Sequence, residues 1–158
     1  MSTPPKNFEP AITLPTDPAR AMQDMMETID SLRAVYVEEN EALNAARTRD
    51  FMALQPRKLE TTRAYHDGIS QMIARKNDFL NVHPDLKSLF RKKQEEFTVV
   101  AEENMEALDR MRRSVNRLNE RIMTAARKSM ERDGVNYGAH GKMKGYHSTA
   151  PMTLNESA

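Results

Sequence analysis

The chain has 158 residues, of which 39% are hydrophobic and 30% are charged, and its formal net charge is +1. One domain's length with only five Phe, four Tyr and no Trp favours a thin helical bundle over a deep globular core. The absence of cysteine excludes disulfides and thiolate chemistry. The near-neutral charge gives no global reason to expect a nucleic acid or a membrane as partner.

No segment is typical of secretion or membrane insertion. Residues 1–17 contain no apolar run of signal-peptide length. No stretch approaches the roughly 20 apolar residues that a membrane-spanning helix needs. We therefore expect a cytoplasmic protein without membrane insertion.

Proline and glycine are segregated to the two ends of the chain. Five of the eight prolines fall in the first 18 residues, and four of the five glycines fall in the last 25. This distribution predicts a Pro-rich irregular tail at 1–17, a helical bundle at 18–132 and a flexible Gly-containing tail at 133–158. Asp17 followed by Pro18 predicts the first helix start, with Asp17 as N-cap.

The first helix is predicted from apolar residues at alternating steps of three and four. Glu39 interrupts this apolar face within an acidic run, Glu38-Glu39-Asn40-Glu41, which we interpret as a solvated helix face. The apolar residues of the predicted face are Met22, Met25, Ile29, Leu32, Tyr36 and Leu43.

A break or bend is predicted somewhere between residues 47 and 56. Asp50 is a candidate N-cap for a new helix, whereas Pro56 removes a backbone hydrogen bond and favours a kink. The second helix is then predicted to continue through Leu59, His66, Ile69, Ile73 and Leu80.

The third helix is the longest predicted element. Pro84 favours a turn at 81–85 and a helix start directly after it. No Gly or Pro interrupts residues 85–133, so this helix is about 70 Å long. Its stripe consists of Leu86, Phe90, Lys93, Phe97, Val100, Asn104, Ala107, Met111, Val115, Leu118, Ile122, Ala125 and Ser129.

Three helices joined by short turns predict an all-α fold, an antiparallel three-helix bundle with a long C-terminal helix and irregular tails at both ends. The third helix is too long for the other two to cover, so we expect residues 112–132 to project or to lie partly uncovered. Between 110 and 132 there are eight Lys or Arg against two acids. An apolar stripe flanked by charge indicates either a partner-binding seam or a surface of the internal core.

The sequence contains no pattern typical of an enzyme. No phosphate-binding glycine loop, nucleophile elbow or zinc motif occurs, and a metal role for His140 with His147 is disfavoured. We therefore expect no catalytic residue, no cofactor and no metal.

Three groups of residues carry a family resemblance. They are Glu41-Ala42-Leu43 with Asp50-Phe51, Leu54, Lys58 and Leu59; the long last helix followed by Val135-Asn136-Tyr137-Gly138; and the short polar end at 150–158. Over about residues 25–145 the chain resembles FlgN-type flagellar export chaperones. Pro56 and the Pro-rich N-terminal segment depart from the family's pattern.

The resemblance implies a cytoplasmic chaperone that binds the amphipathic C-terminal helices of hook-associated (hook-filament junction) proteins. Such a chaperone prevents their premature assembly and delivers them to the type III export gate. By position, the resemblance implies that Tyr137 contacts the gate. We expect the protein to be a monomer or a weak dimer. The implied cargo-binding residues are Val115, Leu118, Ile122, Met123 and Met130.

Two other functions are compatible with the pattern. A homo-oligomeric coiled-coil scaffold is the stronger alternative, because Asn104 at a seam position is typical of residues that set coiled-coil register, unless it faces water. Nucleic-acid binding by residues 110–132 is disfavoured, since the basic residues surround the helix and no aromatic residue there offers a stacking platform.

Overall fold

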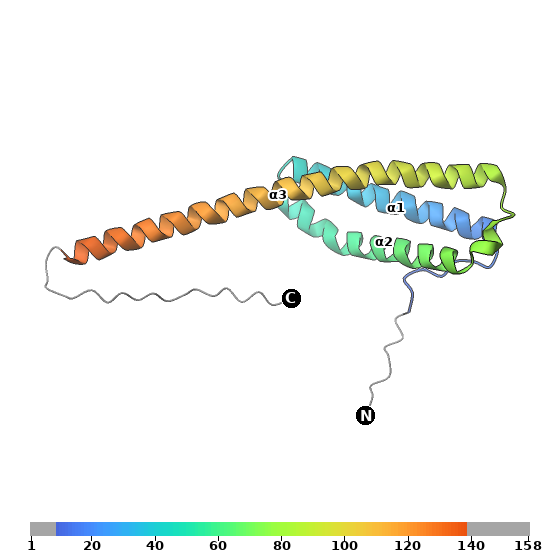
Figure 1. The fold of residues 1–158 in the computed structure, drawn as a ribbon, viewed down its shortest axis with the longest axis horizontal. Helices are drawn as coiled ribbons and strands as arrows, with labels where there is room; N and C mark the ends of the chain where they lie inside the picture. Colours follow the sequence, from blue (N-terminus) through green and yellow to red (C-terminus); the bar gives the residue numbers. More distant parts are fainter. Residues whose placement is uncertain (1–8, 139–158) are drawn as a thin grey trace, which may run out of the picture. The chain divides into compact units, whose positions relative to one another are not determined.

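The computed structural model describes residues 9–138, and side chains for residues 9–134. These residues form α1 (Pro18–Asn44), α2 (Thr48–Ala74), the short 3₁₀ helix η1 (Lys76–Phe79) and α3 (Pro84–Gly138), with no strand among them (Figure 1). The chain divides into two compact units after Arg113. We call α1, α2, η1 and residues 84–113 of α3 the bundle, and residues 114–138 of α3 the C-terminal segment. None of the described helices combines the length and hydrophobicity required to span a bilayer.

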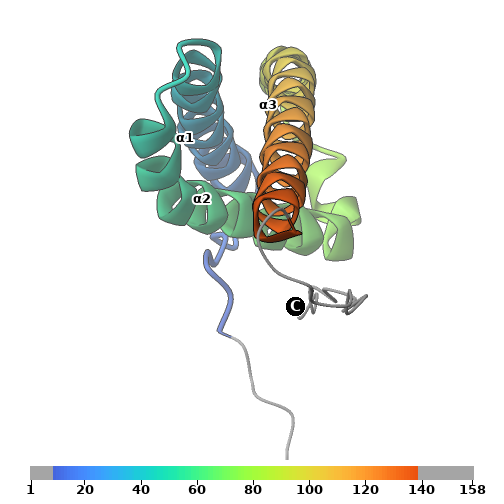
Figure 2. The same ribbon diagram turned by 90° about the vertical axis from the view of Figure 1, so that its left-hand side faces the viewer.

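The bundle has the predicted up-down-up arrangement, in which α2 runs against both α1 and α3 (Figures 1 and 2). Contacts between α1 and α3 advance along both helices in the same direction. Lys93 Nζ lies 2.7 Å from Asp30 Oδ1, the rings of Tyr36 and Phe97 are 5.2 Å apart, and Arg110 Nη2 donates to Asn44 Oδ1 at 3.1 Å. The prediction of an all-α antiparallel bundle is confirmed.

The first and third helices begin where the sequence predicts. The Asp17 side chain accepts a hydrogen bond from the Arg20 amide at 3.0 Å, and Pro18 opens α1. Pro84 is the first residue of α3. In both places proline supplies a helical φ at a position whose N–H would lack an intrahelical partner.

The break between α1 and α2 lies at Ala45-Ala46-Arg47, so only its last residue falls within the predicted interval of 47–56. Asp50 is not the N-cap of α2; the cap is Arg47, whose guanidinium pairs with Asp50 at 3.0 Å. Pro56 does not end the helix either, and lies inside α2. Its position is exposed, so water can satisfy the carbonyl that loses its amide partner.

The core of the bundle is predicted well on α1 and poorly on α2. Met22, Met25, Ile29 and Leu32 are buried as expected. The predicted extent and face of the second helix are wrong, because α2 ends at Ala74, before Leu80. Of the five predicted residues, only Ile69 packs against the core and the other four are exposed. The exposed ones are Leu59, His66, Ile73 and Leu80.

Gly68 explains where α2 actually meets α1. It is buried, and a Cβ added there would lie 2.1 Å from the Met25 sulfur. The backbone of α2 therefore approaches the α1 side chains closely at a residue without a side chain. A face centred on a glycine is invisible to a search for large apolar residues at helical spacing.

Residues 9–17 are irregular, as predicted, but they are bound to α2. Gln71 Nε2 donates to the Ile12 carbonyl at 2.7 Å, and Gln71 Oε1 accepts from the Leu14 amide at 2.9 Å. Arg75 donates to the Pro15 carbonyl at 2.9 Å. Leu14 is 6% exposed and belongs to the core cluster with Met22. This part of the predicted tail is therefore an integral part of the bundle.

The C-terminal boundary differs from the prediction. The helix does not end at 132 but continues through Gly134 to Gly138. A single glycine inside a helix costs only about 1 kcal/mol relative to alanine, which does not by itself terminate a helix. The rest of the predicted tail, 139–158, with His140 and His147, lies outside the described residues.

Candidate functional site

The predicted cargo-binding residues are all exposed. Every residue from 112 to 134 is exposed. The exposed fractions of the five residues are 48% for Val115, 57% for Leu118, 55% for Ile122, 45% for Met123 and 70% for Met130. The sequence left open whether this stripe lines a partner site or the internal core, and the structure places these side chains at the surface.

The apolar face is a continuous feature of the C-terminal segment. Val115, Leu118, Ile122 and Ala125 follow at steps of three and four, so their side chains share one face of the helix. Met123 and Met130 are seven residues apart and lie beside this face, which they widen. We call these six residues the apolar stripe. Clustered exposed apolar side chains mark an interaction site more often than scattered ones do.

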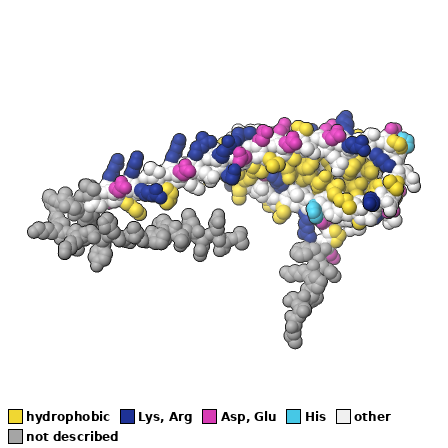
Figure 3. Space-filling view, viewed as in Figure 1, with side chains coloured by type: hydrophobic (Ala, Val, Ile, Leu, Met, Phe, Trp, Pro, Cys, Tyr) yellow, Lys and Arg dark blue, Asp and Glu magenta, His cyan; other side chains and the backbone are white. Residues whose placement is uncertain are grey.

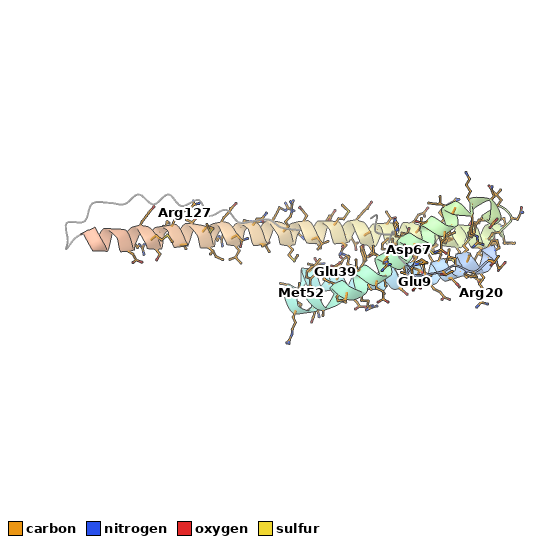
Figure 4. All side chains as sticks on the ribbon, turned by 90° about the horizontal axis from the view of Figure 1, so that it is seen from below. Glu9, Arg20, Glu39, Met52, Asp67 and Arg127 are labelled. Atoms are coloured by element: carbon orange, nitrogen blue, oxygen red, sulfur yellow. The ribbon has the colours of Figure 1, made fainter. Side chains whose placement is uncertain are left out.

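Basic side chains border the apolar stripe. Lys and Arg side chains gather along the latter half of α3 in Figure 3, and Figure 4 labels one of them, Arg127. Just before the segment, Asp109 accepts from Arg112 at 2.8 Å and pairs with Arg113 at 3.0 Å. The hydrogen bond from Arg112, together with the charge of Arg113, holds the pKa of Asp109 below its usual value. Residues 114–138 contain five Lys or Arg against three acidic residues, so the segment combines an apolar face with a surplus of positive charge.

Tyr137, the predicted gate contact, lies within α3, but its side chain is outside the described residues. Its role therefore stays a prediction.

A polar cluster inside the bundle was missed by the sequence. Glu39 is fully buried and accepts hydrogen bonds from Gln55 at 2.8 Å, from Asn104 at 2.7 Å and from Lys58. The Lys58 ammonium also lies 4.4 Å from the centre of the Tyr36 ring. Although burial raises the pKa of Glu39, the hydrogen bonds from Lys58, Gln55 and Asn104 outweigh it and leave the pKa lowered.

One interpretation from the sequence is therefore wrong, and one of the two alternatives that it left open for Asn104 is excluded. Glu39 does not belong to a solvated face, and Asn104, 2% exposed, does not face water. Asn104 donates to Asn40 at 2.8 Å and accepts from Lys58 at 3.0 Å, so its polar groups are used within one chain. In the sequence, the only signal for Glu39 and Asn104 is that each is a polar residue at an apolar helix position. That signal shows neither which residues they contact nor whether they are buried.

Within residues 9–138, no group of three or more His, Cys, Asp or Glu side chains is placed to hold a metal ion. The buried Glu39 is closed off by its own hydrogen-bond partners, and Figure 4 marks its place in the bundle. The apolar stripe is the feature that calls for a functional explanation.

Comparisons with protein-family models, with curated proteins and with solved structures gave no match for this chain.

Proposed function

We propose that this chain is a flagellar export chaperone for hook-associated proteins, and that its apolar stripe binds an amphipathic helix of its cargo. The single observation that carries the binding role is the exposure of Leu118 and Ile122 in the middle of a regular helical stripe. The identity of the cargo follows from the family resemblance. We infer a cytoplasmic location from the same resemblance.

The stripe suits a partner that is held and later released. Fully burying one such side chain contributes roughly 1.5–3 kcal/mol, and these side chains are already about half covered. We therefore expect a moderate affinity for the partner helix. Methionine adapts to irregular partner surfaces because its side chain is unbranched and polarizable, which fits Met123 and Met130 at the edge of the stripe.

The basic border of the stripe favours an acidic cargo helix. Charges at the rim of an interface raise the association rate and select the partner more than they raise the affinity. A cargo helix with acidic residues beside its apolar face would match Arg121 and Lys128. Tyr137, a few residues further along α3, is our candidate for the contact with the export gate.

The binding test uses two exposed residues of the stripe. We expect the Leu118→Asp/Ile122→Asp variant to lose its complex with the C-terminal segment of a hook-filament junction protein from the same organism. Co-expression followed by size exclusion with light scattering measures this, and the wild type should give a one-to-one complex. Both residues are more than half exposed, so the substitutions should leave the helical circular dichroism signal intact.

The matched control is Leu59→Asp/Ile73→Asp on α2. These residues are 72% and 67% exposed, so the control adds the same two charges to another apolar surface. It should bind cargo like the wild type. A folded stripe variant that still binds cargo normally would show that the stripe is not the cargo site.

The alternative function is a homo-oligomeric coiled-coil scaffold. The three-four spacing of the stripe would serve a second copy as well as a cargo helix. Asn104 no longer favours this function, because it bonds to Glu39 and Asn40 within the bundle. A stable dimer of the wild type that the Leu118→Asp/Ile122→Asp variant abolishes, with no binding of cargo, would favour the scaffold.

A further inference from the structure

Positive and negative charges are separated along α3. Residues 94–109 contain six acidic residues and no Lys or Arg, whereas residues 110–132 contain eight Lys or Arg and two acidic residues. In Figure 3 acidic side chains gather on the first half of α3 and basic ones on the second. The acidic residues are Glu95, Glu96, Glu102, Glu103, Glu106 and Asp109.

The acidic residues form a row on the solvent side of the bundle. Glu95, Glu102 and Glu106 share one helix face because they are seven and four residues apart. This face is opposite the one that packs into the bundle through Val100 and Asn104. All three carboxylates are exposed, as is the neighbouring Glu96. We call these four residues the acidic row.

The basic residues of the C-terminal segment form a second row. Arg117, Arg121 and Lys128 are four and seven residues apart, so they share one face as well. Arg127 lies next to them. This basic row runs beside the apolar stripe and uses none of its residues.

Each row contains like charges at helical spacing. Glu102 and Glu106 are four residues apart, and so are Arg117 and Arg121. Like charges at this spacing destabilise a helix. Lys92 and Arg110 already pair with Glu96 and Glu106 at 4.0 Å. A partner surface of opposite charge would reduce the repulsion further, and each row is the complement of the other.

We propose that a second copy of this chain binds through these rows, with the two α3 helices antiparallel. The spacing fixes the register. Residue numbers rise by one, six and four along the acidic row from Glu95, and they fall by one, six and four along the basic row from Lys128. The resulting contacts join Glu95 to Lys128, Glu96 to Arg127, Glu102 to Arg121 and Glu106 to Arg117. Each of these contacts joins the bundle of one copy to the C-terminal segment of the other.

The physical character of this contact determines how it should behave. Exposed ion pairs are individually weak, so the dimer depends on several pairs acting together. Salt weakens such pairs, because the Debye length falls from about 10 Å at about 0.1 M to about 3 Å at about 1 M ionic strength. The apolar stripe takes no part in this contact. Arg121 and Lys128 belong to the basic row and also face the proposed acidic cargo helix, so a second copy and a cargo helix would compete for these two side chains.

The test is a charge exchange between the two rows, measured by sedimentation on the full chain at about 0.1 M salt. We expect Glu95→Lys/Glu102→Lys and Arg121→Glu/Lys128→Glu each to weaken self-association by about tenfold or more, and about 1 M salt to do the same to the wild type. An equal mixture of the two variants should restore association. In the mixture, both contacts again join opposite charges.

The control is Glu27→Lys/Glu60→Lys, which changes the net charge by the same amount at exposed positions on α1 and α2. It should self-associate like the wild type. Circular dichroism checks that every variant is folded. Because the chain has no cysteine, a Val99→Cys/Thr124→Cys variant tests the register directly: oxidation should link two chains.

Three results would overturn the proposal. The first is a wild type that stays monomeric at low salt up to its solubility limit. The second is a mixture of folded variants that does not associate. The third is a dimer that persists at about 1 M salt and is lost in the Leu118→Asp/Ile122→Asp variant. This last result would assign the dimer to the apolar stripe, whereas the charge-paired dimer should survive that substitution.

Discussion

Glu39 is a buried carboxylate whose negative charge is balanced by Lys58. The Lys58 side chain is 17% exposed, so water reaches the lysine but not the carboxylate. Removing one partner of a buried ion pair is strongly destabilising, because the remaining charge is left in a medium of low polarizability. The stability of the bundle therefore depends strongly on Lys58.

We expect Lys58→Met to lower the free energy of unfolding by about 3 kcal/mol at neutral pH. In the wild type the pKa of Glu39 is lowered from 4.5, so its stabilising contribution is present above that pH and is lost as the pH falls through the lower folded-state value. In the variant, burial without the lysine raises this pKa. The difference in the free energy of unfolding between the wild type and Lys58→Met should therefore become smaller towards acidic pH. Urea unfolding at several pH values measures it.

The control for this prediction is Arg57→Met, one residue away. Arg57 pairs with Glu38 at 2.9 Å, and both side chains are about half exposed. Losing a surface ion pair of this kind costs less than about 1 kcal/mol. A Lys58→Met effect as small as that of Arg57→Met, or one that does not change with pH, would contradict the role of the buried carboxylate.

The sequence could not predict this cluster from its residues alone. Glu39 was recognised as a polar residue at an apolar position of α1, and Asn104 as one at an apolar position of α3. Whether two such residues meet depends on how far α3 is shifted along α1. That shift is set by contacts such as Tyr36 with Phe97, which are remote in sequence.

At the scale of helices, the packing of α1 on α2 depends on Gly68. We expect Gly68→Ala to destabilise the bundle by about 1–3 kcal/mol, as overpacking of a filled core does. The added Cβ would lie 2.1 Å from the sulfur of Met25, whose side chain is fully buried. This steric cost should exceed the gain of about 1 kcal/mol in helix propensity.

Gly134→Ala is the matched control, because no atom lies within 4 Å of a Cβ added to Gly134 in α3. It should leave the melting temperature unchanged or raise it, whereas Gly68→Ala should lower it. If both substitutions raised the melting temperature, the close approach of the two helices would not exist in solution.

The helix starts could be predicted because they are encoded locally. Asp17 with Pro18, and Pro84, each fix a boundary through the backbone of two or three residues. The buried face of α2 and the position of residues 9–17 could not be predicted, because both depend on tertiary contacts. Gln71 binds two backbone groups of the N-terminal segment, and no local pattern distinguishes it from an exposed glutamine.

At the scale of the whole molecule, the two units differ in what stabilises their helices. In the bundle, the helices are held by a core that includes Ile29 and Val35, neither of which is exposed at all. In the C-terminal segment every described side chain is exposed. Most of the stability of helices in proteins comes from tertiary packing, which the segment lacks, so it should open locally at a low free-energy cost.

Amide hydrogen exchange measures this difference directly. In dilute protein we expect the Ile122 amide to exchange much faster than that of Ile29, because exchange at Ile122 needs only a local opening, of about 2 kcal/mol or less. Binding of a cargo helix to the apolar stripe should slow exchange at Ile122 and leave Ile29 unchanged. Ile122 protection equal to that of Ile29 in dilute protein without cargo would mean that the stripe is already covered. Since a covered stripe cannot also be the open site for a cargo helix, that result would remove the basis of the chaperone proposal.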